Sequence, residues 1–180
     1  MRKRIKNITR LPINGMLIAV YIVLSLPMLT INVGGLKFTF EHFPVLLCAV
    51  LYGPIDGMIV GALGELINQM MTFGFTPTTA LWILPIAVRG ILVGLGARMF
   101  KKQTRFNPIW MWIVCILSGV VSSGLNTLAL YVDSKMFGYY TYELVFGVLA
   151  MRITLSAITS FVMGNVLAPV QFGLKKAGLI

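Results

Sequence analysis

The sequence predicts an all-α integral membrane protein with six transmembrane helices and with its N- and C-termini in the cytoplasm. Of its 180 residues, 58% are hydrophobic and only 11% are charged, whereas a soluble domain is about 25% charged. The mean hydropathy is +0.89. A span needs about 20 apolar residues, so the length accommodates roughly six spans joined by short loops. Basic residues cluster in alternate loops, which is typical of a multi-pass membrane protein.

The first elements follow from apolar runs and the residues that interrupt them. Pro27 should kink or end the first span. The Gly34-Gly35 pair marks a loop at 32–37, and Pro44 opens a short second span. The six expected spans cover approximately residues 14–31, 41–51, 57–71, 80–100, 109–132 and 143–173.

The later elements carry recognisable boundary signals. A tight turn at 52–57 joins the second span to the third. Thr78 or Thr79 can cap the fourth span. Trp110 and Trp112 open the fifth span in the pattern of an aromatic belt. The sixth apolar segment is longer than a simple crossing needs, which predicts a tilted helix or one with a broken start.

The distribution of positive charge predicts the orientation. Eleven of the fifteen Lys and Arg residues fall on the side of the N-terminus, while Lys37 and Lys135 fall on the other side. Arg89 and Arg152 fall within spans. Because cytoplasmic loops are enriched in Lys and Arg, both termini are expected inside the cell.

The whole chain, 1–180, is expected to form a single membrane domain with a basic cytoplasmic N-terminal segment, 1–13. That segment resembles the basic region of a signal peptide. The apolar run after it is long enough to span, however, and no small-residue cleavage site follows it, so the segment is interpreted as leading into a retained first helix.

Several function classes lack the residues they need. The positive charges lie between apolar runs and are not interleaved with aromatic residues, which argues against a nucleic-acid partner. Cys48 and Cys115 form no CxxC pair, and His42 beside Glu41 provides too few ligands for a metal. There is no P-loop, HExxH or GxSxG motif. We therefore expect no cofactor, no metal and no enzymatic activity.

Small residues recur every four positions. Such a ridge allows helix backbones to approach closely within a membrane, and packing inside the bundle is the simpler interpretation. On the first span, Gly15 and Ala19 form a similar face that could instead dock a partner subunit. The ridge itself consists of glycines 53, 57 and 61, which run from the turn at 52–57 into the third span, and of glycines 90 and 94 in the fourth span.

Two opposite charges are expected near mid-depth. Glu65 in the third span and Arg89 in the fourth lie at similar distances from the membrane surfaces. An unpaired charge there costs about 2.5–3.5 kcal/mol on insertion scales. An ion pair is therefore predicted, either as a structural link between two helices or as a substrate contact.

Polar and aromatic residues gather at the outward-facing ends of the spans. Rings of a ligand can stack on Trp or Tyr, amides can bind heteroatoms, and Arg can bind a carboxylate or phosphate. These groups predict a pocket for a flat, polar, partly anionic molecule, although an ordinary interfacial belt explains some of them. The predicted substrate-binding residues are Asn68, Gln69, Trp82, Asn126, Tyr131 and Arg152.

The sequence resembles the substrate-binding S components of energy-coupling factor (ECF) vitamin transporters. Six short spans, a basic N-terminus and a Tyr52-Gly53-Pro54 turn leading into a glycine-ridged helix that ends in an acid carry the likeness. It is nearest to the folate family, in the runs KFTFEHFPV at 37–45 and LYGPIDG at 51–57.

This resemblance implies a vitamin pocket open to the outside of a prokaryotic cell membrane. The loops at 32–40 and 72–79 would close it, with Lys37, Phe38, Phe75 and Thr76 as lid residues. The partners implied are a membrane coupling subunit (the T component) and two ATPases, with Gly15 and Ala19 in place of the family's Ala-x-x-x-Ala docking pattern. Toppling of the S component in the bilayer is the transport step proposed for the family.

The vitamin itself stays open at this stage. Folate-binding relatives tend to carry an arginine near the end of the first span, where this chain has leucines, a serine and Pro27. Cobalamin or another vitamin or precursor is the alternative substrate. Alternatives from other classes are a membrane enzyme acting on a lipid or isoprenoid, and a purely structural assembly subunit.

Overall fold

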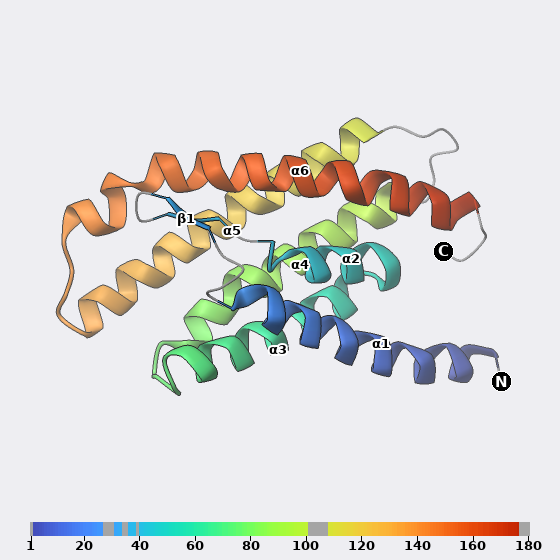
Figure 1. Ribbon diagram of the computed structural model, residues 1–180, viewed down its shortest axis with the longest axis horizontal. Coiled ribbons are helices and arrows are strands. Elements are labelled where there is room, and N and C mark those ends of the chain that lie inside the picture. Colours follow the sequence, from blue (N-terminus) through green and yellow to red (C-terminus); the bar gives the residue numbers. More distant parts are fainter. Residues whose placement is uncertain (1, 27–30, 34–35, 39, 101–107, 177–180) are drawn as a thin grey trace.

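In the residues that it describes, the computed structural model is built of six α-helices (Figure 1). It describes residues 2–26, 31–33, 36–38, 40–100 and 108–176. The helices are α1 (Arg2–Ser25), α2 (Phe43–Tyr52), α3 (Pro54–Thr72), α4 (Thr79–Phe100), α5 (Pro108–Met136) and α6 (Leu149–Lys176), with a π-helical turn, η2 (Glu143–Gly147), before α6.

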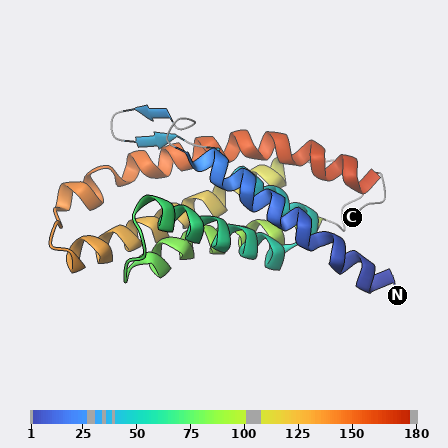
Figure 2. The same ribbon diagram turned by 60° about the horizontal axis from the view of Figure 1, so that its bottom comes forward.

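The predicted all-α membrane fold is confirmed. Within the described residues, three helical segments are long and apolar enough to cross a membrane: Thr79–Met99, Ile109–Met136 and Glu143–Val170. The start of α1 and the end of α6 lie at the same end of the molecule (Figures 1 and 2). The number of crossings and the side on which the termini lie stay predictions.

The segment after α1 differs from its predicted form. α1 ends at Ser25 and does not reach residue 31. Two short strands, β1 (Ile31–Val33) and β2 (Leu36–Phe38), pair antiparallel in the segment predicted as a loop, with Ile31 opposite Phe38. β2 lies against α6 (Figure 2). Strands of three residues are too short to produce a recognisable alternation.

α2 is the central helix of the fold. It has ten residues and therefore a length of about 15 Å, and it contacts α1, α3, α4 and α6. Leu46 and Ala49 belong to one buried apolar cluster with residues of α4, α5 and α6. Val45 and Cys48 belong to a second cluster with Tyr21 of α1 and with residues of α3 and α4. α2 therefore links the two halves of the core.

The turn between α2 and α3 is shorter than predicted. Gly53 alone separates the two helices and has a φ of 109°, a conformation that favours glycine. Pro54 begins α3 at the first helical position, where its missing N–H costs nothing.

The glycine ridge packs α3 directly against α4. A Cβ at Gly90 would lie 2.6 Å from the carbonyl group of Gly57, and a Cβ at Gly94 would lie 2.4 Å from Pro54. A Cβ at Gly61 would lie 3.1 Å from the carbonyl oxygen of Ile86. The backbones of the two helices therefore touch, and these glycines serve packing within the bundle.

Because Gly90 has no room for a side chain, we expect Gly90→Ala to destabilise the protein by about 1–3 kcal/mol. Thermal unfolding of the purified protein in detergent measures this change. Gly124→Ala in α5 is the matched control, because nothing lies within 4 Å of its Cβ position. The control should leave stability unchanged or raise it by up to about 1 kcal/mol. Equal behaviour of the two variants would contradict the backbone contact.

Candidate functional site

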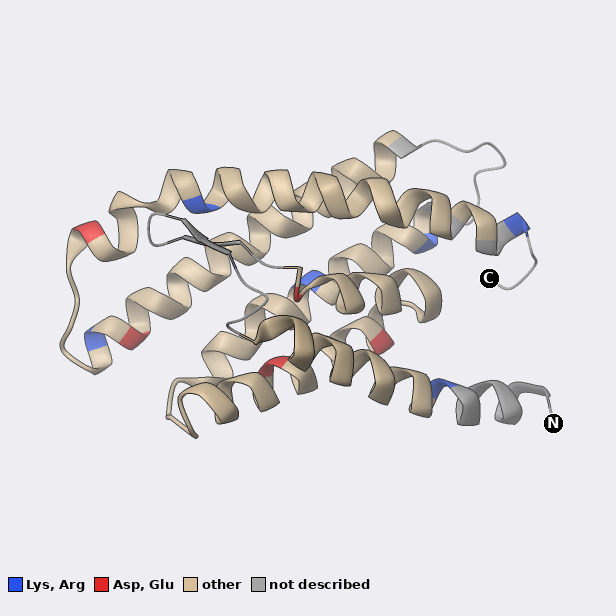
Figure 3. Cartoon of the chain, viewed as in Figure 1, with Lys and Arg blue, Asp and Glu red and all other residues tan. Residues whose placement is uncertain are grey.

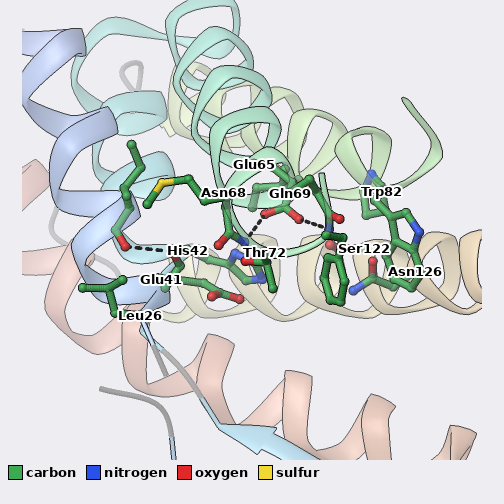
Figure 4. A pocket seen from close by; sticks show the side chains of 16 residues that line it. Leu26, Glu41, His42, Glu65, Asn68, Gln69, Thr72, Trp82, Ser122 and Asn126 are labelled. Carbon is green, nitrogen blue, oxygen red and sulfur yellow. Dashed lines mark hydrogen bonds between the residues drawn. The ribbon is translucent and has the colours of Figure 1, made fainter. Parts of the chain in front are cut away.

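A cavity of about 620 Å³ lies between the end of α1, the start of α2, the second half of α3, the first half of α4 and the middle of α5. Figure 4 shows the side chains that surround it. Ser25 and His42 contribute from α1 and from the residue before α2, and Ser122 contributes from α5. A volume of this size is typical of small-molecule sites.

Four of the six predicted substrate-binding residues line this cavity: Asn68, Gln69, Trp82 and Asn126 (Figure 4). Asn68 and Gln69 are adjacent on α3. Ser122 and Asn126 are four residues apart on α5 and therefore lie on one face of that helix. Three helices thus direct polar or aromatic side chains into one space.

The other two predicted residues are not among those that line the cavity. Tyr131 packs edge-on against Tyr140 with ring centroids 5.5 Å apart, because five residues beyond Asn126 turn its side chain by about 140° around α5. Arg152 donates a hydrogen bond of 3.3 Å to the carbonyl of Leu144 in η2. Depth along a helix alone therefore does not bring these two residues to the cavity, and their role in binding stays a prediction.

Of the predicted lid residues, Phe75 and Thr76 lie within the described part of the chain. Phe75 is 79% exposed, whereas the Thr76 backbone N–H donates to the hydroxyl of Thr79 at 3.0 Å, just before α4. The backbones of Lys37 and Phe38 lie in β2. The described part of the structure does not include their side chains.

Three charged or ionisable residues that were not among the six predicted substrate-binding residues also belong to the pocket. Glu41 and His42, which follow the hairpin, line the cavity, and so does Glu65 (Figure 4). The helical spacing of polar residues on α3 could have identified Glu65. It lies three residues before Asn68 and four before Gln69, so the three side chains share one face of the helix. No helical pattern covers Glu41 and His42, since they precede α2.

Glu65 is held by three hydrogen-bond donors. Its Oε2 accepts from the Tyr21 hydroxyl at 2.6 Å and from the Asn68 amide at 3.3 Å. Its Oε1 accepts from the Gln69 amide at 2.7 Å. Tyr21 is completely buried, so this network ties α1 to α3 beside the cavity.

The predicted Glu65–Arg89 ion pair is wrong. Arg89 donates through Nη2 to the Ser160 hydroxyl at 2.7 Å, and the salt bridge found among the described residues joins Arg10 and Asp56. Similar depth does not bring two side chains together, because the rotation of each helix also decides where they point. Glu65 is satisfied by neutral donors, so its charge needs no cation at this position.

The charges around the cavity are negative. Glu41 and Glu65 are its charged lining residues, and no Lys or Arg is among the residues that line it in the described part of the chain. Figure 3 shows how few charged residues occur along the helices. Arg89 is only 2% exposed and lies about one turn beyond Pro85 and Ile86, which form part of the cavity wall. The walls therefore suit hydrogen-bond donors better than carboxylates.

Asp133, in the last turns of α5, bonds the residue that precedes α4. It accepts hydrogen bonds from the hydroxyls of Thr78 and Tyr139. Burial, together with the bond to Asp133, raises the pKa of Tyr139 to about 12. This tyrosine therefore keeps its proton and its donor role at every physiological pH.

A second, open cavity of about 600 Å³ lies between α1 and α3, near the start of α3. Asn14 donates to Asp56 at 3.0 Å, and Arg10 lies 3.7 Å from the same carboxylate. Gly15 lines this groove, and both Gly15 and Ala19 are exposed. The predicted docking residues thus lie on a free face of α1.

Comparison with known protein families gives a match over almost the whole chain. A family model described as "ECF transporter, substrate-specific component" matches residues 9–177. A UPF0397 protein of Leuconostoc citreum is 29% identical over 97 residues, which cover 49% of this chain and 50% of that protein. A UPF0397 protein of Clostridium perfringens is 23% identical over 125 residues and 66% of each chain. This chain therefore spans half to two thirds of the length of these curated relatives.

Two solved structures share the fold. One is described as "Structure and mechanism of the S component of a bacterial ECF transporter"; it has a TM-score of 0.57, 21% identity and coverage of 95% of both chains. The other is described as "Crystal structure of FolT bound with folic acid"; it has a TM-score of 0.58, 22% identity and coverage of 86% of this chain and 90% of that one.

Because Tyr21 donates a hydrogen bond to Glu65, removal of its hydroxyl group should lower the free energy of unfolding. Hydrogen bonds to charged groups contribute about 1.5–3 kcal/mol, so Tyr21→Phe should destabilise the protein by about that amount. Thermal unfolding in detergent measures it. Tyr142→Phe is the control, because Tyr142 is 69% exposed and should change stability by less than about 0.5 kcal/mol. An unchanged Tyr21→Phe variant would contradict the role of this bond.

Proposed function

The chain belongs to the family of substrate-specific components of ECF transporters, and from this premise we propose that it captures a vitamin in the cavity between α3, α4 and α5. Its family binds substrates for transport, so the protein is not an enzyme. The observation that carries the proposal is the cavity of about 620 Å³ lined by polar and aromatic side chains from several helices. A purely structural subunit would need no such space.

Folate or a related vitamin is the substrate we favour. The wall formed by Glu65, Asn68 and Gln69 offers oxygen acceptors to the N–H groups of a pterin ring, and Trp82 offers an aromatic face for stacking. The fold is shared with a protein whose structure is described as bound with folic acid. Cobalamin is the second candidate, but a corrin ring with its nucleotide is far larger than folate and fits a cavity of about 620 Å³ less well.

The energy for uptake would come from partners. The sequence contains no P-loop, and the free α1 face with Gly15 and Ala19 suits close packing against another membrane helix. We therefore propose that the protein works in the prokaryotic cell membrane, as a multi-pass subunit with a T component and two ATPases.

Binding to purified protein tests the proposed function. The full chain in detergent is titrated with folate, cobalamin, riboflavin and pantothenate, and native mass spectrometry identifies any molecule retained through purification. Folate should bind with nanomolar affinity and in a ratio of one to one. Tight binding of another vitamin instead would replace the substrate, and the absence of binding by all four would refute the function.

Substitutions on α5 and α6 test the position of the site. Asn126→Ala removes a polar group from the cavity wall and should weaken vitamin binding about three- to tenfold. Asn165→Ala is the matched control, since Asn165 lies on α6 and donates to the carbonyl of Phe161. Arg152→Ala should also leave affinity unchanged, because Arg152 contacts η2. A loss confined to Arg152→Ala would place the ligand elsewhere.

If α1 docks a partner subunit, substitutions on its exposed face should reduce vitamin uptake without changing vitamin affinity. Gly15→Leu and Ala19→Leu each add bulk to an exposed face, so they should preserve vitamin affinity but reduce cellular uptake at least tenfold in the presence of the partner subunits. Gly124→Leu, at another open glycine position on α5, should preserve both. Uptake at the wild-type rate in the α1 variants would exclude this face as the docking surface.

A further inference from the structure

We infer that Glu65 is a positioning residue that holds the amides of Asn68 and Gln69 with their carbonyl oxygens toward the cavity, so that this wall selects a ligand edge with adjacent N–H donors. The 2-amino-4-oxo edge of a pterin is such an edge. This inference rests on the proposed function and specifies which end of the ligand the α3 wall receives.

The orientation of the two amides follows from the chemistry of their shared partner. An ionised carboxylate can only accept hydrogen bonds, so the side of each amide that faces Glu65 has to be the NH₂ group. Gln69 donates to Oε1 at 2.7 Å, and Asn68 donates to Oε2 at 3.3 Å. Spacings of three and four residues place all three side chains on one face of α3.

The carbonyl oxygens of these amides are then the groups left for a ligand. The hydrogen bonds found among the described residues engage the NH₂ groups of Asn68 and Gln69 and give neither the Asn68 Oδ1 nor the Gln69 Oε1 a donor. Both side chains line the cavity (Figure 4). Two acceptors therefore stand side by side at the cavity wall, and a ligand has to supply the donors.

Tyr21 explains why the carboxylate itself stays in place. Its hydroxyl donates to Oε2 at 2.6 Å from the neighbouring helix α1, and its side chain is fully buried. Tyr21 is not among the residues that line the cavity. Tyr21 thus holds Glu65 from the side away from the cavity, and the remaining lone pairs of the carboxylate orient the amides of Asn68 and Gln69.

The charges near the wall agree with a donor-bearing ligand. Glu41 and Glu65 line the cavity, and no Lys or Arg joins them among the described lining residues. A ligand carboxylate at this wall would face the Glu65 carboxylate and two carbonyl oxygens. The anionic part of a folate-type molecule therefore points away from α3, and its heterocycle points toward it.

Pterin and lumazine test the inference, because lumazine carries a carbonyl oxygen where pterin carries the 2-amino group. Both compounds are titrated against the full-length protein in detergent. The wild-type protein should bind pterin at least tenfold more tightly than lumazine. Glu65→Gln should reduce this preference to less than threefold, because an amide at this position can also donate and lets a neighbouring amide turn its NH₂ group to the cavity.

Two further variants separate positioning from stability. Gln69→Met removes one of the acceptors while Glu65 stays in place, so it should also reduce the preference even if Glu65→Gln does not fold. Tyr21→Phe removes a hydrogen bond from the same carboxylate but leaves both amides oriented. It should lower the thermal stability, and it should reduce the preference less than Glu65→Gln does, because the carboxylate still accepts from Asn68 and Gln69.

The possible results distinguish failure of the inference about Glu65 from failure of the proposed transport function. Equal binding of pterin and lumazine by the wild-type protein overturns the inference, and so does an unchanged preference in both Glu65→Gln and Gln69→Met. A wild-type protein that binds another vitamin but no pterin also overturns the inference while leaving the transport function intact. A protein that binds none of the four vitamins refutes the proposed function itself.

Discussion

The backbone contact between α3 and α4 is the constraint on which the site depends. Gly57 and Gly90 let the two helices touch, and Gly94 lies against Pro54. Between residue 65 and the end of α3, and between the start of α4 and residue 89, neither helix contains a glycine. Side chains from these parts of the helices, among them Glu65, Gln69 and Trp82, line the cavity. The small residues thus hold α3 and α4 together beside the cavity.

Polar contacts at two places join α1 to α3, and each place lies beside a different proposed site. Asn14 bonds Asp56 at the open groove, and Tyr21 bonds Glu65 at the cavity. Seven residues separate the two positions on α1 and nine separate them on α3, in the same direction, so the helices run parallel. Movement of α1 along α3 would disturb both contacts together. The helix that is proposed to dock a partner is therefore also the helix that fixes the carboxylate beside the ligand.

Much of the architecture could be predicted because it depends on composition and on regular spacing. The glycine ridge follows from a spacing of four. Of the polar and aromatic residues expected at the outward-facing ends of the spans, four line the cavity: Asn68, Gln69, Trp82 and Asn126. The wrong predictions have a common cause. Arg89 bonds Ser160, 71 residues away, and Glu65 bonds Tyr21, 44 residues away. Depth in a membrane can be estimated along one helix, but the rotation of a helix and its distant neighbours depend on tertiary packing, which one-dimensional spacing does not contain.

The shortness of α2 has a consequence for the way the protein is made. Ten residues extend about 15 Å, roughly half of the hydrocarbon thickness, and almost every side chain of α2 that faces the core is covered by other helices. Contact with lipid alone would therefore stabilise α2 only slightly. It would enter the bilayer together with α3, to which Gly53 joins it directly, and it would reach its final environment only when α4 and α6 have been synthesised. The cluster that contains Leu46 and Ala49 is thus completed only by α4, α5 and α6, which are made after α2.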